Sequence, residues 1–166
     1  MPGRSTSETT RPQIYSTAER ARRDATAWTL VQGILAPLQF LVFLASLVLV
    51  LRYLATGEGY AAATVSIVVK TGVLYLIMVT GAIWEKVVFG QYLFAPAFFW
   101  EDAVSMIVIA LHTLYLVALM AGWAGPQALM WIALAAYASY AVNASQFLLK
   151  LRRARLEAPA GAGVPA

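Results

Sequence analysis

The chain has 166 residues, of which 61% are hydrophobic and only 12% charged, with a net charge of +4 and a mean hydropathy of +0.71. Soluble globular domains carry about 25% charged residues, so this composition excludes a soluble domain and, more firmly, a disordered chain. The lack of cysteine excludes disulfides, thiolate metal sites, iron–sulfur clusters and cysteine nucleophiles. The composition predicts a protein that lies in a lipid bilayer.

Residues 1–27 are polar and rich in Ser, Thr and Arg. They lack the early apolar stretch and the cleavage site of a signal peptide. We expect a disordered N-terminal arm that becomes amphipathic over residues 17–24. The Ala-, Gly- and Pro-rich residues 158–166 predict a disordered tail, which leaves a membrane domain over residues 28–157.

Long uncharged segments make up this membrane domain. Residues 27–51 can form one helical span of about 20 residues, and residues 59–84 form a second such segment that only Lys70 interrupts. Residues 103–149 would form a helix of about 70 Å, over twice the thickness of the hydrocarbon layer, so they must turn back, and 122–126 is the obvious turn. The sequence predicts an all-α integral membrane four-helix bundle with spans near 28–52, 60–85, 100–121 and 127–150.

The distribution of Lys and Arg predicts the orientation of these spans. Four spans place both termini on one side, which then holds the basic residues before the first span, Lys86, and the basic residues from Lys150 onward. Arg52 is the only strong base beside the spans on the opposite side. Because cytoplasmic loops are enriched in Lys and Arg, both termini are expected to be cytoplasmic.

Polar residues within the spans are few, and a helical spacing of about 100° per residue arranges them in stripes. The stripes are Gln32, Gln39 and Ser46; Glu101, Ser105 and His112; and Ser139, Asn143, Gln146 and Lys150. Such stripes are typical of interhelical hydrogen bonds and also of ligand contacts inside a bundle. His112 is either a hydrogen-bonded core histidine or an axial ligand. Lys70 either snorkels, pairs with a carbonyl, or has a direct function.

Most of these groups converge on the cytoplasmic half of the bundle. Glu85, Lys86, Glu101 and Asp102 lie near the predicted boundary, and His112 lies about 16 Å beyond Glu101. One explanation of Glu85 and Lys86 is an ion pair at the membrane boundary. One explanation of Glu101 and Asp102 is a favourable interaction of acidic side chains with the dipole at a helix N-terminus. However, adjacent carboxyl groups at a low-dielectric boundary disfavour each other's ionisation. A carboxyl group that keeps its proton near neutral pH can act as a general acid.

Aromatic residues are concentrated between the second and third spans. The seven are Trp84, Phe89, Tyr92, Phe94, Phe98, Phe99 and Trp100. An aromatic belt at the membrane interface accounts for some of them, but not for this density beside four charged residues. The combination favours a large, flat, apolar ligand with a charged edge. Familiar catalytic motifs such as HExxH, GxSxG and GxGxxG are absent, and nothing indicates nucleic-acid binding.

Residues 84–102, WEKVVFGQYLFAPAFFWED, resemble the vinyl bacteriochlorophyllide hydratases of bacteriochlorophyll biosynthesis. The resemblance extends to WTLVQG at 28–33, APLQF at 36–40, ATGEG at 55–59 and QFLLKLR at 146–152, and covers about residues 15–157. It implies hydration of the C3 vinyl group of chlorophyllide a, or of a bacteriochlorophyllide, to a 1-hydroxyethyl group. It also implies that no cofactor is added, because the Mg²⁺ belongs to the substrate.

The resemblance implies no catalytic residues, so the site is predicted from the residues themselves. Vinyl hydration needs a proton donor, a positioned water with a base, and a flat slot. We expect Glu101 to be the acid, Asp102 to keep it protonated, and Glu85 to orient or deprotonate the water, with Asn143 and Gln146 in support.

Binding roles are predicted for further residues. Lys86, or Lys150 with Arg152, would meet the propionate of the substrate, and His112 is a candidate axial ligand of its Mg²⁺. The stacking walls would be Trp84, Phe98, Phe99 and Trp100. The expected partners are the tetrapyrrole, water and membrane lipid, with a homo-oligomer left open. The alternative is a non-catalytic tetrapyrrole carrier or assembly factor, in which the carboxyl groups would have no required task.

Overall fold

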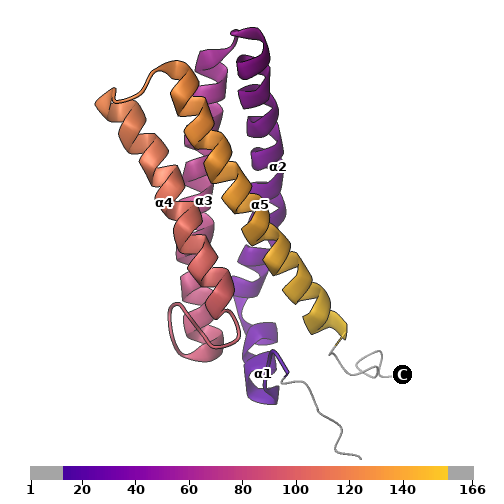
Figure 1. Ribbon diagram of the computed structural model, residues 1–166. Coiled ribbons are helices and arrows are strands. Elements are labelled where there is room, and N and C mark those ends of the chain that lie inside the picture. Colours follow the sequence, from indigo (N-terminus) through magenta and orange to yellow (C-terminus); the bar gives the residue numbers. More distant parts are fainter. Residues whose placement is uncertain (1–12, 157–166) are drawn as a thin grey trace, which may run out of the picture.

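The computed structural model describes residues 13–156, and the elements in this part of the chain are all helices (Figure 1). They are α1 (Thr17–Ala25), α2 (Ala27–Thr56), α3 (Tyr60–Phe89), α4 (Phe99–Ala121) and α5 (Pro126–Leu156). The predicted all-α fold and the four predicted spans are confirmed, but the count of helices is five, because the predicted amphipathic lead-in forms the separate helix α1. Thr26 separates α1 from the first span because its extended backbone ends one helix and caps the next. The predicted tail, 158–166, lies outside the described residues.

Four of these helices, α2 to α5, are long and apolar enough to cross a membrane. Helices α2 and α3 have 30 residues each and are therefore about 45 Å long, which exceeds the thickness of a hydrocarbon layer, about 30 Å. Large apolar side chains such as Leu30, Leu41 and Val65 point outward and are more than half exposed. An outward apolar surface of this kind suits contact with lipid and agrees with the predicted multi-pass membrane protein.

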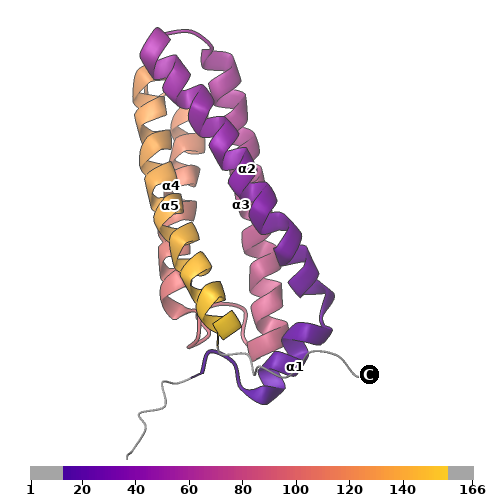
Figure 2. The ribbon, with the colours of Figure 1, turned by 90° about the vertical axis from the view of Figure 1, so that its right-hand side faces the viewer.

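The spans form two antiparallel hairpins, α2 with α3 and α4 with α5, which pack against each other (Figures 1 and 2). The short connections after α2 and after α4 lie at one end of the bundle. Helix α1, the 90–98 connection and the C-terminal part of α5 lie together at the other end, which we call the α1 end (Figure 2). The 90–98 connection therefore meets both the N-terminal segment and the last turns of the chain.

Local sequence determines where the helices begin and end. Ser16 and Glu19 form a capping box at the start of α1, with the Ser16 Oγ accepting from the Glu19 amide and the Glu19 carboxylate accepting from the Ser16 amide. Helix α2 ends at Gly57, whose φ of +75° is the left-handed conformation that glycine adopts most readily. Helix α5 begins with Pro126, which needs no partner for the amide hydrogen it lacks.

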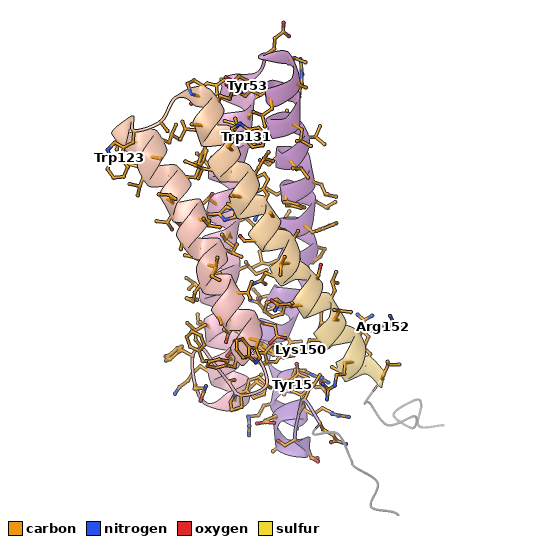
Figure 3. All side chains as sticks on the ribbon, in the orientation of Figure 1. Tyr15, Tyr53, Trp123, Trp131, Lys150 and Arg152 are labelled. Atoms are coloured by element: carbon orange, nitrogen blue, oxygen red, sulfur yellow. The ribbon has the colours of Figure 1, made fainter. Side chains whose placement is uncertain are left out.

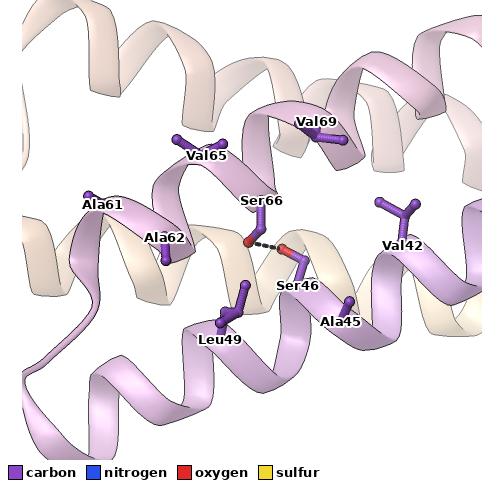
Figure 4. Close-up of a pocket in the computed structure, with 9 residues that line it drawn as sticks. All are labelled: Val42, Ala45, Ser46, Leu49, Ala61, Ala62, Val65, Ser66 and Val69. Atoms are coloured by element: carbon purple, nitrogen blue, oxygen red, sulfur yellow. Dashed lines mark hydrogen bonds between the residues drawn. The ribbon is translucent and has the colours of Figure 1, made fainter.

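Interhelical hydrogen bonds fasten the bundle. The Gln32 side-chain amide donates to Thr80 Oγ1 at 2.8 Å and joins α2 to α3. The Ser46 hydroxyl lies 2.7 Å from that of Ser66 and 2.5 Å from that of Tyr137, so it joins α2 to both α3 and α5. Ser46 and Ser66 meet beneath an apolar outer groove of about 610 Å³ between α2 and α3 (Figure 4). For Gln32 the interpretation as an interhelical hydrogen bond is confirmed.

The helix ends supply a test of stability. We expect Gly57→Ala to lower the free energy of unfolding by about 1 kcal/mol, because an L side chain is strained at the φ of Gly57. Gly72→Ala is the matched control, since Gly72 lies inside α3 with nothing within 4 Å of an added Cβ. This second change should stabilise the helix by about 0.5–1 kcal/mol. Unfolding in mixed micelles measures both, and equal effects of the two substitutions would contradict the expectation.

Candidate active site

Three of the predicted carboxyl residues meet where α3 ends and α4 begins. Glu85 lies in the last turns of α3, and Glu101 and Asp102 lie in the first turn of α4; each is at most 7% exposed. The 90–98 connection folds over them. Its Phe94 amide donates to Asp102 Oδ2 at 2.7 Å, and its Ala95 amide donates to Glu85 Oε2 at 3.3 Å. The acids are therefore covered by backbone rather than open to solvent.

Glu85 and Asp102 are also hydrogen-bonded to each other through their side chains. A hydrogen bond between two carboxyl groups requires a proton on one of them, because an ionised carboxylate can only accept. The two residues therefore form an acid pair that shares a proton at the edge of the bundle. A shared, buried proton of this kind is suited to general acid catalysis.

Glu101 has a different partner. Its Oε2 lies 2.6 Å from Nζ of Lys150, which comes from α5. Lys150 also donates to the Ala97 carbonyl in the connection, and its ammonium group lies 4.8 Å from the centre of the Phe98 ring. Glu101 therefore has a cation as its side-chain partner, whereas Glu85 and Asp102 have each other. Lys150 thus joins α5, α4 and the connection at a single point (Figure 3).

Asn143 supports the backbone beside Glu101. Its side-chain amide donates to the Glu101 carbonyl at 3.2 Å and to Ser105 Oγ at 2.6 Å, while the Ser105 hydroxyl donates to the same carbonyl at 2.8 Å. Asn143 therefore holds the first turn of α4 against α5. Among the described residues, the side-chain amide of Asn143 bonds to the main-chain carbonyl of Glu101 and not to its carboxylate.

A groove of about 260 Å³ lies next to the ion pair and is lined by Glu101, Gln146, Leu149, Lys150 and Arg153. The Gln146 Oε1 is buried there and has no hydrogen-bond partner among the described residues. Arg152, which the sequence suggested, does not line this groove and is exposed (Figure 3). Arg153 occupies the position instead, which gives the groove two cationic side chains.

Lys86 points elsewhere. Its Nζ donates to the Gly90 carbonyl at 2.7 Å and lies 5.3 Å from the centre of the Tyr92 ring. It therefore caps the C-terminus of α3 at an exposed position, away from the acid pair that its neighbour Glu85 joins.

The aromatic residues divide into two groups. Trp84, Phe89 and Phe98 pack inward with ring centres 5.6–5.8 Å apart, and Trp84 also donates to Thr29 Oγ1 at 2.9 Å. Phe99 and Trp100 point outward and are 47% and 71% exposed. The structure therefore does not bring the four predicted stacking residues together on one wall.

Tyr15 completes the inner aromatic group, which the sequence did not suggest. Its ring stacks on Phe89 at 5.8 Å and lies 6.3 Å from Phe98, and it is only 4% exposed. The Arg23 guanidinium lies 4.8 Å from the ring centre, and Arg22 Nε donates to the Val88 carbonyl. The capping box at 16–19 indicates where α1 begins, but it does not indicate the contacts of Tyr15 with Phe89 and Phe98.

His112 lies in the middle of the bundle rather than beside the acids. It is fully buried, its Nδ1 lies 2.8 Å from the Val108 carbonyl, and its ring centre is 5.9 Å from that of Tyr137. Within residues 13–156, no group of three His, Asp or Glu side chains is arranged to hold a metal ion.

Comparison with known proteins decides the family. The model of the family described as 2-vinyl bacteriochlorophyllide hydratase matches residues 15–153. The chain belongs to this family. The resemblance noted in the sequence is therefore confirmed, and the hydratase-family match includes Tyr15, all three carboxyl groups and Lys150.

Two curated relatives carry the name 2-vinyl bacteriochlorophyllide hydratase. The protein of Cereibacter sphaeroides is 73% identical over 146 residues, which cover 87% of this chain and 90% of the relative. That of Rhodobacter capsulatus is 70% identical over 148 residues, which cover 89% of this chain and 86% of the relative. No solved structure matches this member of the hydratase family.

Burial raises the pKa of Tyr15 above its usual range, although the nearby Arg23 guanidinium opposes the shift. Because the pKa is higher in the folded state, the Tyr15 contact stabilises the fold fully below the ordinary tyrosine pKa of about 10 and loses this contribution as the pH rises further. We expect Tyr15→Phe to remove a tyrosinate absorbance change that lies at higher pH than the ionisation of a free tyrosine amide. Identical titrations would show that Tyr15 is not held in the cluster.

Proposed function

We propose that this protein adds water across the ring vinyl group of a chlorophyllide-type tetrapyrrole to give a 1-hydroxyethyl substituent. Its membership of the hydratase family supports this activity. The observation that carries the proposal is the buried acid pair of Glu85 and Asp102 beside Glu101, which is ion-paired with Lys150. A pigment carrier would need none of these three groups, and burying them would only destabilise it.

The chemistry requires a proton before it requires a water molecule. Protonation of the terminal CH₂ leaves positive charge on the inner carbon, where the conjugated macrocycle delocalises it. Water then attacks that carbon, and loss of one proton from the attacking water leaves the secondary alcohol. The proton taken from water replaces the one that was donated, so the reaction needs no electron carrier, and the Mg²⁺ is part of the substrate.

We assign the proton to the pair of Glu85 and Asp102. Glu101, which is the expected acid from the sequence alone, is instead ion-paired with Lys150 and is not part of this pair. After protonating the vinyl group, the pair carries a negative charge and can accept the proton of the attacking water. Glu101 would then stabilise the positive charge that develops on the macrocycle.

The groove beside Lys150 fits the charged edge of the substrate. At about 260 Å³ it is smaller than the 300–1,000 Å³ typical of sites that enclose a ligand, so it would hold only part of a macrocycle. Lys150 and Arg153 would meet the propionate there, and the exposed Phe99 and Trp100 at the start of α4 would support the flat ring. The 90–98 connection must then move aside to uncover the acid pair.

The distribution of basic residues supports placing the α1 end at the cytoplasmic face of a bacterial inner membrane. The basic residues described at this end are Arg20, Arg22, Arg23, Lys86, Lys150, Arg152, Arg153 and Arg155, whereas the opposite end has Arg52. Cytoplasmic segments beside spans are enriched in Lys and Arg. The charged edge of the substrate, which carries the propionate, and the reacting water molecule would then reach the acids from the cytoplasm.

The activity has a direct test. We expect purified protein incubated with chlorophyllide a in H₂¹⁸O to yield a pigment heavier by one molecule of labelled water. Product retaining the vinyl group, together with retention of the pigment on the protein, would favour the carrier instead. Boiled protein is the control for spontaneous hydration.

The assignment of the acid is tested by three isosteric variants. Glu85→Gln and Asp102→Asn should each lower turnover about a hundred-fold to ten-thousand-fold, as expected for loss of a general acid. Glu101→Gln should lose less, because it removes charge stabilisation but not the shared proton. Pigment retention and accumulation in membranes should stay unchanged, and Glu58→Gln at the opposite end is the matched control. A loss confined to Glu101→Gln would return the acid role to Glu101.

A further inference from the structure

A second polar cluster lies in the middle of the bundle and takes no part in the proposed chemistry. Lys70 of α3 and His112 of α4 are fully buried, and Gln39 of α2 is 1% exposed. The Lys70 Nζ, the His112 Nε2 and both polar atoms of the Gln39 amide have no hydrogen-bond partner among residues 13–156. Three different helices therefore direct unpartnered polar groups into the core.

Aromatic rings surround the lysine instead of acids. The Lys70 Nζ lies 3.6 Å from the centre of the Tyr140 ring and about 6 Å from the rings of Phe43 and Tyr137. The ion pairs in the described part of the chain involve other residues. A ring face attracts a cation but uses none of its three N–H groups as a conventional hydrogen bond.

Lys70 and His112 share Tyr137 as a neighbour, and Gln39 lies on the face of α2 that reaches Lys70. The charge of Lys70 acts on His112. The Lys70 Nζ and the centre of the His112 ring each lie 5.9 Å from the ring centre of Tyr137. Gln39 precedes Phe43 by one helical turn and so lies on the same face of α2 as the ring beside Lys70. All three side chains therefore face the same part of the core.

The donors and acceptors specify the ligand. Since the His112 Nδ1 faces the Val108 carbonyl, that nitrogen must carry the hydrogen, and the Nε2 is then an acceptor. Lys70 offers only donors, and Gln39 offers both kinds of group. A molecule that accepts from Lys70 and donates to His112 satisfies both, and water does so, whereas an anion would face the lone pair of Nε2.

We propose that Lys70, His112 and Gln39 form a buried water site at the centre of the bundle. Ordered water there hydrates the lysine and completes the hydrogen bonds of the histidine and the amide. The site is distinct from the acid pair and does not depend on the proposed hydration reaction. It lets the bundle hold a cation among aromatic rings in the interior of the membrane.

Radiolytic hydroxyl-radical labelling of the full-length protein in lipid nanodiscs tests this site. Radicals form from local water, so Tyr137 should be oxidised although it is only 2% exposed. Met130 is the internal comparison, since it is fully buried on the same helix and is intrinsically more reactive. Labelling of Tyr137 above that of Met130 supports the water site, and a Tyr137 as unreactive as Met130 overturns it.

Variants and salts sharpen the result. The triple variant Lys70→Met, His112→Leu and Gln39→Leu should lower Tyr137 labelling several-fold. Thr71→Val is the matched control, because the Thr71 hydroxyl bonds to its own helix, and it should leave the labelling unchanged. Replacing chloride by gluconate should not shift the thermal midpoint of the wild-type protein. A chloride-dependent shift that Lys70→Met abolishes would overturn the proposal in favour of an anion site.

Discussion

The ion pair between Glu101 and Lys150 is the interaction on which the α1 end depends. It joins α4 to α5 within one hairpin, whose helices otherwise pack mainly through apolar side chains. It also compensates the charge of one of three buried carboxyl groups that meet where α3 ends and α4 begins. Without Lys150, three acids would share a low-dielectric site with at most the amides of the connection for compensation. Because the Glu101–Lys150 ion pair compensates one carboxylate, Glu85 and Asp102 need only share one proton between them. The proposed chemistry uses this shared proton.

The same arrangement couples the acids to the shape of the 90–98 connection. Phe94 has a φ of +59°, which is uncommon for a residue other than glycine and indicates local strain. Its amide is held by Asp102, and the neighbouring Ala95 amide is held by Glu85. These two hydrogen bonds offset the strain only while the carboxyl oxygens face the connection. A substrate that draws the acid pair toward its vinyl group would weaken both bonds, so uncovering the site and delivering the proton are linked.

Sequence patterns predicted the fold and the location of the site better than they predicted which side chains contact each other within it. Uncharged length and the turn at 122–126 specify four spans, and depth along those spans places Glu85, Glu101 and Asp102 at one end. The partner of Glu101 could not be predicted, because it depends on the rotation of α5 relative to α4, and only packing of whole helices determines that angle. A rotation of about 100°, the angle between consecutive residues, exchanges Arg152 for Arg153 in the groove. The position of Tyr15 depends likewise on how α1 folds back beneath α3, which no periodicity within a span encodes.

Lys70 and Lys150 show how one bundle treats the same group in different ways at different depths. Lys150 lies near the end of its span, where Glu101 of the neighbouring helix α4 is available and water is close, so an ion pair compensates its charge. Lys70 lies in the middle of its span, where the neighbouring helices present rings, an imidazole and an amide. An acid at that depth would bring a second desolvation cost that the attraction between the charges only partly repays. Aromatic faces attract the ammonium group and bound water hydrates it, and neither adds a second charge. This difference explains why the acids near these lysines lie at the edge of the bundle while its centre keeps a lysine.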